Sequence, residues 1–221
     1  DRNNPDRMYA GGVSGGLWIS DDAGANWRAY NDMLQNLIIT CITQASNGDI
    51  YLGTGEYVYG RFTTGDENSG FQGQGIFKST DNGTTFTRLS STWDALSSSF
   101  KNQWIFINQI ATAPSNPKRI YVATHLGFRL SNDSGATWTM SVKLQNGGTV
   151  PTGIASDVQV ASDGTVLVCI SSNLYKSTNG DDGTYVKVSA FPSGGRNYKF
   201  AIAPSNPNYI YAAAPGQIQR T

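Results

Sequence analysis

The sequence predicts an all-β protein in which units of four antiparallel strands follow one another along the chain. The first observation is a short pattern, Ser-x-Asp-x-Gly-x-x-aromatic, that occurs four times and ends at Trp27, Phe86, Trp138 and, in a degenerate copy, Tyr185. The copies lie 59, 52 and 47 residues apart, and a period in this range is typical of repeat architectures. The second observation is that short β-rich segments surround each copy, whereas long runs with helical periodicity are absent.

Each copy of the pattern combines residue types that favour a tight turn between two strands. An Asp side chain can accept hydrogen bonds from backbone amides two residues further on, and Gly allows a positive φ. An aromatic ring at the end of the turn is large enough to fill the space between neighbouring sheets. We therefore expect all four terminal aromatics to be buried at the starts of outer strands. We assign structural rather than catalytic roles to the residues of the three regular copies: Ser20, Asp22, Gly24, Trp27, Ser79, Asp81, Gly83, Phe86, Ser131, Asp133, Gly135 and Trp138.

The other strands of each unit follow in a fixed order. First strands are predicted at residues 37–44, 106–113, 154–160 and 199–203. Second strands follow Asn-Pro, Asn-Gly or Asp-Gly turns, and one position in them is held by Tyr9, Tyr51, Tyr121, Leu167 and Tyr211. Third strands are predicted at 15–20, 75–79, 127–131 and 173–177, and the turns lead into fourth strands such as 84–90 and 136–142.

This arrangement resembles the Asp-box β-propellers, a superfamily that includes bacterial sialidases, xyloglucan hydrolases and the sortilin ectodomain. The resemblance covers nearly all of the 221 residues. It implies a β-propeller of four-stranded antiparallel blades. It does not by itself imply one activity, because the superfamily contains both hydrolases and pure binders.

We expect one propeller segment over residues 1–221, with blade boundaries near residues 36, 104, 152 and 197. The first residues enter a second strand and the last ones stop where a fifth pattern would begin, which gives three full blades and two partial ones. A propeller needs about four to eight blades to close its ring. We therefore expect an incomplete ring that is a fragment of a longer chain, unless the two end blades merge into one of five.

The composition favours a protein that works outside the cell. Charged residues make up 14% of the chain, against about 25% in an average soluble domain. Sixteen basic and sixteen acidic side chains cancel, so we expect neither a nucleic acid nor an anionic membrane as partner. No apolar run approaches the length of a membrane span. The low charge and the Asn-Pro turns are similar to those of secreted proteins of Bacteroidetes-type bacteria, which implies a secreted or cell-surface bacterial protein.

The repeat is most strongly interrupted in the second blade. From the tyrosine position to the Ser of the pattern, the second blade uses 28 residues, whereas three other blades use 10 or 11. The extra segment is 55–75, and a second expansion, 91–104, follows the pattern of the same blade. Both are expected on the face opposite the Asp-containing turns, which is the usual ligand face of propellers.

These two segments have the composition of a sugar- or peptide-binding surface. Aromatic rings can stack on sugar rings or hold apolar side chains, and charged groups can fix the orientation of a ligand. The alternative is that the two loops only cap the blade, with their rings turned inward. We expect ligand contacts from Tyr57, Tyr59, Arg61 and Trp93, with Glu56 and Asp66 as polar anchors.

Other chemistry has less support in the sequence. Oxygen ligands from Glu56, Asp66, Glu67 and Asn68 would suit Ca²⁺, but their spacing is not that of an EF-hand, so we expect no metal site and no cofactor. His125 is the single histidine, which disfavours His-pair metal sites and a Ser-His-Asp triad. We also expect Cys41 and Cys169 to be buried thiols rather than a disulfide, because they lie in different blades.

Two functions remain from the sequence. The first is a noncatalytic module that binds an extracellular glycan or protein, as the sortilin propeller binds peptides, with the remaining blades supplied by the same or another chain. The alternative is part of a glycoside hydrolase of the sialidase or xyloglucan-hydrolase kind. The Phe/Tyr-Arg-Ile-Pro signature of sialidases is absent from this sequence. A xyloglucan-type hydrolase needs two opposed carboxylates. Glu56, Asp66, Glu67 or Asp94 could supply one of them, and no motif distinguishes any of the four.

Overall fold

A computed structural model describes residues 1–30, 36, 38–57, 70–93, 102–188, 198–214 and 217–220. The chain divides into two compact units, residues 1–110 and 111–221. Within the described ranges the regular elements are β-strands, apart from one 3₁₀ turn at Ser90–Thr92. In the same ranges, no helix is long and apolar enough to cross a membrane.

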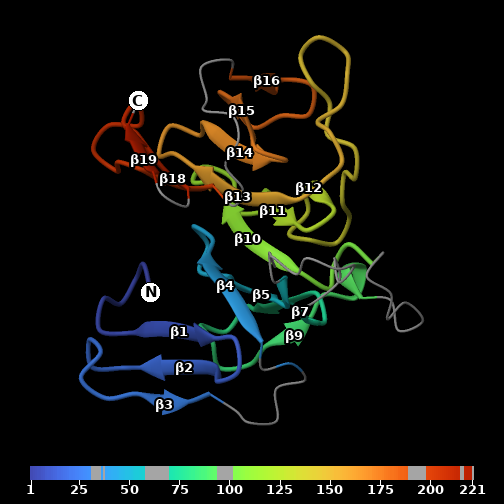
Figure 1. The fold of residues 1–221 in the computed structure, drawn as a ribbon. Coiled ribbons are helices and arrows are strands. Elements are labelled where there is room, and N and C mark those ends of the chain that lie inside the picture. Colours follow the sequence, from blue (N-terminus) through green and yellow to red (C-terminus); the bar gives the residue numbers. More distant parts are fainter. Residues whose placement is uncertain are drawn as a thin grey trace. The chain divides into compact units, whose positions relative to one another are not determined.

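Among the described residues, five antiparallel sheets of three or four strands follow one another along the chain, and we number them as blades 1 to 5 (Figure 1). Blade 1 contains β1 (Met8–Gly12), β2 (Gly16–Ser20) and β3 (Arg28–Ala29), and blade 2 contains β4 (Ile39–Gln44), β5 (Ile50–Thr54), β8 (Ile76–Ser79) and β9 (Thr87–Arg88). Blade 3 contains β10 (Ile107–Thr112), β11 (Ile120–Thr124) and β12 (Gly127–Ser131). Blade 4 contains β13 (Ala155–Val160), β14 (Val166–Ile170), β15 (Asn173–Ser177) and β16 (Val186–Lys187). Blade 5 contains β17 (Lys199–Ile202), β18 (Ile210–Ala214) and β19 (Gln217–Arg220).

The strand order within the blades agrees with the prediction. Blades 2 and 4 have four strands, and the end blades have three each. Blade 3 differs in one detail, because its fourth strand is reduced to a single bridge between Leu130 and Thr139. Beside that bridge the Arg129 guanidinium donates a hydrogen bond to the Met140 carbonyl.

Three Ser-Asp turns, at residues 20–27, 79–86 and 131–138, share one hydrogen-bond pattern, and the degenerate turn at 177–185 repeats part of it. In the second turn, Ser79 Oγ donates to Asp81 Oδ1 at 2.7 Å and accepts from the Gly83 amide at 2.8 Å. Asp81 Oδ1 also accepts from the Thr85 amide at 2.8 Å. The first and third turns repeat these bonds. In the degenerate turn, Asn179 takes the place of the Asp and lies 3.2 Å from Ser177 Oγ. The Asp of the pattern therefore ties the turn together through backbone amides.

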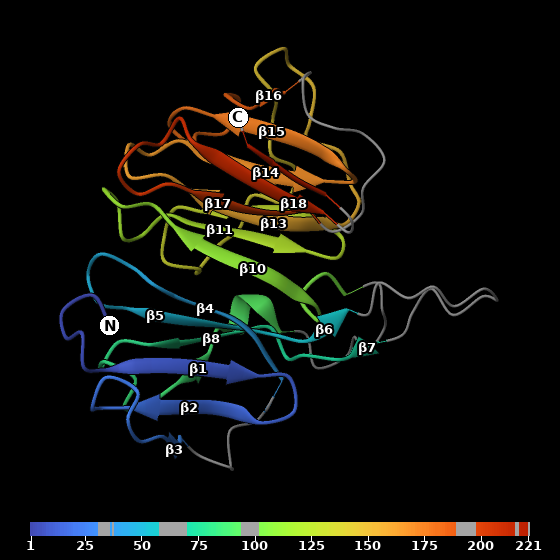
Figure 2. The same ribbon diagram turned by 60° about the vertical axis from the view of Figure 1, so that its left-hand side comes forward.

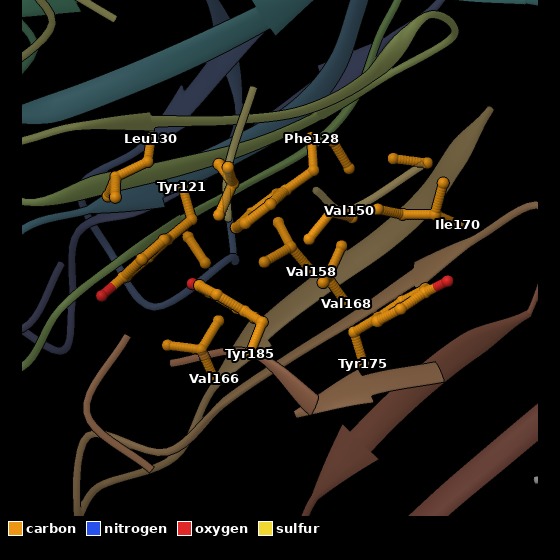
Figure 3. Close-up of a cluster of buried hydrophobic side chains, with 14 of the residues drawn as sticks. Tyr121, Phe128, Leu130, Val150, Val158, Val166, Val168, Ile170, Tyr175 and Tyr185 are labelled. Carbon is orange, nitrogen blue, oxygen red and sulfur yellow. The ribbon is translucent and has the colours of Figure 1, made fainter. Parts of the chain in front are cut away.

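Neighbouring blades within each unit pack through apolar faces. In the first unit, Leu17 and Ile19 of blade 1 lie in one buried cluster with Ile50, Leu52 and Phe77 of blade 2. In the second unit the same arrangement joins blade 3 to blade 4, where Tyr121, Phe128 and Leu130 face Val166, Val168, Tyr175 and Tyr185 (Figure 3). The cores are thus formed between blades rather than within a sheet.

A tyrosine of each leading blade docks on the Ser-Asp turn of the next blade in these two pairs. Tyr9 Oη donates to the Asn82 carbonyl at 3.1 Å, and its ring fills the space beside Gly83. Tyr121 occupies the corresponding space beside Gly180. There Arg119 also donates to the Asn179 carbonyl at 3.2 Å and forms an ion pair with Asp181 at 2.6 Å.

The prediction that all four terminal aromatics are buried is wrong for Trp27. Tyr185 is fully buried and packs edge-on against Phe128 of blade 3, with ring centroids 5.4 Å apart. Phe86 is half-buried and meets Tyr30, which follows β3, at 5.3 Å. Trp138 is half-buried, whereas Trp27 is 41% exposed. The reason is that a ring of the preceding blade covers the terminal aromatic, as Tyr30 covers Phe86 and Phe128 covers Tyr185. Among the described residues no blade precedes blade 1.

Three further buried residues of the strands are Arg129 and the two cysteines. Arg129 pairs with Val122 as Trp18 pairs with Ala10, so Arg129 holds the aromatic position of the third strand without a register shift. Its buried guanidinium donates to the carbonyls of Phe128, Met140 and Leu126. Cys41 and Cys169 are buried thiols that form no disulfide.

The Ser-Asp turns predict an acid-sensitive contribution to stability. Hydrogen bonds from the Thr85 side chain and amide, and from Ser79, lower the pKa of Asp81 to about 2. A carboxylate whose pKa is lowered by folding stabilises the fold at neutral pH and loses this contribution as the pH falls from its ordinary value of 3.8 toward 2. Replacing Asp81 with Asn, the residue of the fourth turn, should therefore flatten the fall in unfolding free energy over this interval. Urea denaturation at a series of pH values measures the unfolding free energy of both proteins. An equal dependence on pH in the two proteins would contradict the role given to the Asp81 carboxylate.

Candidate ligand-binding face

The two expansions of blade 2 leave the sheet at the end opposite its Ser-Asp turn. Ile50 pairs with Ser79, so the turn lies where β5 begins. The first expansion follows the other end of β5 and continues into β6 (Glu56–Tyr57) (Figure 2). Because β9 is antiparallel to β8, the second expansion leaves from this same end. We call the described residues here, 54–57, 70–75, 92–93 and 102–106, the loop face of blade 2.

The first expansion begins and ends in a two-stranded ribbon formed by β6 and β7 (Gly70–Phe71). Glu56 pairs with Phe71, and Tyr57 pairs with Gly70. Directly opposed residues of an antiparallel pair project to the same side. Tyr57 packs edge-on against Phe106 at 5.3 Å, and a Cβ at Gly70 would overlap that same ring. Glu56 and Phe71 are therefore on the outer side, and Phe71 is 61% exposed.

The base of the ribbon is closely packed. The Gly73 amide donates to the Ile105 carbonyl at 2.8 Å, and the Gly55 amide donates to the Ile38 carbonyl at 3.1 Å. Thr54 Oγ1 donates to the Gly75 carbonyl at 2.6 Å and accepts from the Gln74 amide at 2.8 Å. Gly55 has φ +89°, and a Cβ there would overlap the Ile105 carbonyl. Only glycine fits this position, and the close contacts hold the ribbon to the blade.

The second expansion meets the first at this base. Thr92 Oγ1 accepts a hydrogen bond from the Ile76 amide at 3.0 Å. The Arg88 guanidinium lies over the Trp93 ring, 4.3 Å from its centroid, and donates to Gln74 Oε1 at 2.8 Å. Arg88 thereby joins the end of β9, the first expansion and the start of the second, and leaves Trp93 half-buried.

The structure describes three of the six residues that the sequence suggested for ligand contact. Glu56, Tyr57 and Trp93 lie on the loop face and are half-buried. Tyr57 turns one edge toward Phe106, as a capping residue would, and keeps part of its surface open. Tyr59, Arg61 and Asp66 lie outside the described residues.

Two residues of this face were not selected from the sequence. Phe71 has the most exposed aromatic ring among the described residues. Its outward direction follows from its pairing with Glu56, and that register could have been suspected from the Gly70 that must face Tyr57. The role of Arg88 could not be predicted from a sequence pattern, because its contact with Trp93 depends on how the chain turns after β9.

Neither a metal cluster nor a second site emerges from the described residues. Within them no group of three or more His, Cys, Asp or Glu side chains could hold a metal ion. Asp66, Glu67 and Asn68, the other members of the suggested Ca²⁺ ligand set, are not in the described part of the chain. A hollow of about 250 Å³ lies beside the first Ser-Asp turn. Its carboxylates already have partners, since Asp22 binds Asn26 and Asp21 pairs with Arg7 and Arg28.

Comparison with known proteins identifies the fold. No family model and no curated protein matches the sequence. Among solved structures, the chain is similar to an ancestral GH74 enzyme, with a TM-score of 0.67 and 17% identity over 100% of this chain and 30% of that one. The chain is a β-propeller.

Two further neighbours come from bacterial proteins outside the cytoplasm. One is the extracellular domain of a B. thetaiotaomicron protein described as a hybrid two-component system, with a TM-score of 0.65 and 12% identity over 98% of this chain and 26% of that one. The other is PorZ, a surface component of the type-IX secretion system of Porphyromonas gingivalis, with a TM-score of 0.54 and 13% identity over 98% and 37%. The chain thus spans between a quarter and two fifths of the length of these structures. At such identities the likeness shows the propeller fold alone.

The packing of the ribbon base predicts a large difference between two glycines with similar backbone angles. Gly48 has φ +93° with open space around it, whereas Gly55 has φ +89° and contacts the Ile105 carbonyl. Replacement by Ala should cost about 1–2 kcal/mol at either position for the left-handed backbone. Gly55→Ala should cost about 1–3 kcal/mol more because of overpacking. Urea denaturation of both variants measures the difference, and equal costs would show that the ribbon is not held as described.

Proposed function

We propose that this chain is a noncatalytic binding module of a secreted or cell-surface bacterial protein, and that it binds an extracellular glycan or protein on the loop face of blade 2. The observation that carries the proposal is the meeting of two separate expansions at one closely packed base. Long loops on a rigid scaffold are the usual place for function in such folds. Loops whose ends are held by hydrogen bonds and ring contacts present a surface at a lower entropic cost to a ligand.

The exposed groups of this face have complementary chemistry. Phe71 offers an open ring, and Glu56 lies directly across the ribbon from it. A sugar ring can stack on such an aromatic face while a neighbouring carboxylate accepts its hydroxyl hydrogens. The same pair could hold an apolar side chain beside a backbone amide of a protein ligand. Trp93, supported by Arg88, is the second aromatic of the surface, and Tyr59, Arg61 and Asp66 are proposed to complete it.

We also propose that the chain belongs to the Asp-box propellers. The hydrogen-bond pattern of the four Ser-Asp turns supports this assignment, as do propeller neighbours among extracellular and surface proteins. The low charge of the chain supports a position outside the cell. We propose further that additional blades, on the same or another chain, pack against this segment, and that binding needs no cofactor.

The binding proposal can be tested on a glycan array together with an array of extracellular proteins. Phe71→Ala and Trp93→Ala should each weaken binding of the captured ligand by about 1–3 kcal/mol, because contact aromatics contribute on this scale. Glu56→Gln should weaken glycan binding more than it changes the unfolding free energy. Val186→Ala, which truncates an exposed side chain on β16, is the matched control and should leave binding unchanged. Binding that survives the loss of both rings would overturn the proposal.

Two additional experiments distinguish the binding module from a glycoside hydrolase and from a metal-dependent site. Incubation with xyloglucan and with sialylated oligosaccharides tests for hydrolysis, and release of products would replace the binding module with a glycoside hydrolase. Of the carboxylates suggested for that chemistry, Glu56 lies within the described residues. Binding should also persist in EDTA, whereas its loss on chelation and return with Ca²⁺ would show a metal-dependent site.

A further inference from the structure

The outer side of the β6–β7 ribbon carries a carboxylate beside an open aromatic ring. Glu56 pairs with Phe71, and directly opposed residues of such a pair have Cβ atoms about 4.5–5.5 Å apart. Phe71 is 61% exposed and Glu56 is half-buried. Within the described residues, the Glu56 side chain has neither an ion pair nor a hydrogen bond. A ring and a negative charge are therefore within reach of the same group of a ligand.

The inner side of the ribbon fixes the direction of this pair. Tyr57 packs edge-on against Phe106, with ring centroids 5.3 Å apart. A Cβ at Gly70 would lie 2.9 Å from the same Phe106 ring. Because the space opposite Tyr57 accommodates only a glycine, Glu56 and Phe71 stay on the outer side of the ribbon.

Blade 2 contains an internal example of the same combination with a cation bound to it. Lys78 Nζ lies 2.7 Å from Asp49 Oδ2 and 5.4 Å from the centroid of the Tyr51 ring. The face of an aromatic ring attracts a cation electrostatically, and a carboxylate adds a charge-assisted hydrogen bond. Glu56 and Phe71 provide the same two groups, and within the described residues no cation of the chain contacts them.

The sequence of the two expansions has the same bias toward acidic and aromatic residues. The chain as a whole has as many acidic as basic side chains. Residues 55–75 and 91–104 have two basic residues, Arg61 and Lys101, against four acidic ones: Glu56, Asp66, Glu67 and Asp94. The same two segments contain seven aromatic residues: Tyr57, Tyr59, Phe62, Phe71, Phe100, Trp93 and Trp104. An excess of acidic side chains favours a basic ligand over an acidic one.

We infer that the pair of Glu56 and Phe71 binds a basic side chain of a protein ligand, with arginine preferred over lysine. The inference rests on the proposed function, since it names the kind of ligand that the loop face of blade 2 takes. A planar guanidinium can stack on the Phe71 ring while two of its N–H groups donate to the Glu56 carboxylate. Lysine offers a compact charge that cannot stack in this way. A neutral sugar can use the ring but brings no positive charge to the carboxylate.

Binding of the purified chain to an array of random decapeptides tests the inference. The bound peptides should share an arginine or a lysine. Replacing that arginine with citrulline keeps the shape of the side chain and removes its charge, and acetylation does the same for lysine. Either replacement should weaken binding by at least about tenfold, because it removes both the ion pair and the attraction to the ring.

Three variants of the chain locate the contact. Glu56→Gln removes the charge, and Phe71→Leu removes the aromatic face but keeps an apolar side chain. Each should weaken the arginine peptides by at least about fivefold and leave the urea midpoint unchanged. In the Glu56→Gln chain, citrulline should make a much smaller difference than in the unmodified chain, since both changes remove the same ion pair. Asp6→Asn, which neutralises an exposed carboxylate outside the loop face of blade 2, is the matched control and should bind as the unmodified chain does.

The outcomes separate this inference from the proposed function. Peptides that bind equally well with citrulline, or that the Glu56→Gln chain binds as tightly as the unmodified chain, would overturn the inference. A chain that binds none of the peptides would overturn it too. A glycan or protein whose binding needs the rings of Phe71 and Trp93 but not the charge of Glu56 would overturn the inference and leave the proposed function standing. Ligands that need neither ring would overturn the proposed function itself.

Discussion

The contact between a second-strand tyrosine and the turn glycine of the next blade is the constraint on which the blade packing depends. In the second Ser-Asp turn, the Ser79 and Asp81 side chains accept hydrogen bonds from the Gly83 and Thr85 amides. The Asn82 carbonyl and the surface of Gly83 contact the preceding blade instead. Tyr9 uses both features at Asn82 and Gly83. Tyr121 fills the same space at Gly180. The turn therefore acts twice, first within its own blade and then as the docking point for the blade before it.

This division of roles leaves the opposite end of the blades free to vary. A longer connection at the turn end would displace the docking tyrosine, whereas a longer connection after β5 displaces nothing in the blade contacts. Blade 2 has its long insertion at that free end, and the insertion is tied down locally through Gly55, Gly73 and Ile105. The proposed binding surface thus depends on the same constraint as the fold, since the blade contacts that hold the scaffold also determine where additional residues can be placed.

Much of the fold could be predicted from the sequence because its signals are local. Each Ser-Asp turn is specified by eight or nine consecutive residues, and the spacing between turns specifies the strand order. The exposure of Trp27 could not be predicted in this way, because burial of this residue type depends on a neighbouring blade and not on the turn itself. The direction of Phe71 likewise depends on its pairing with Glu56, which lies 15 positions earlier in the sequence. Contacts between distant segments, such as Arg88 on Trp93, leave no pattern in a single sequence.

A double-mutant cycle between Tyr9 and Gly83 tests the central claim most directly. A Cβ at Gly83 would lie 2.7 Å from Cε1 of Tyr9, and Gly83 has φ +73°. In the unmodified protein, Gly83→Ala carries both the backbone cost and the clash with the ring, whereas in a Tyr9→Ala background only the backbone cost remains. The account predicts that the two changes are not additive in unfolding free energy, with a coupling of at least about 1 kcal/mol. Additive effects within error would contradict the docking of each tyrosine on the next turn as the basis of the blade packing.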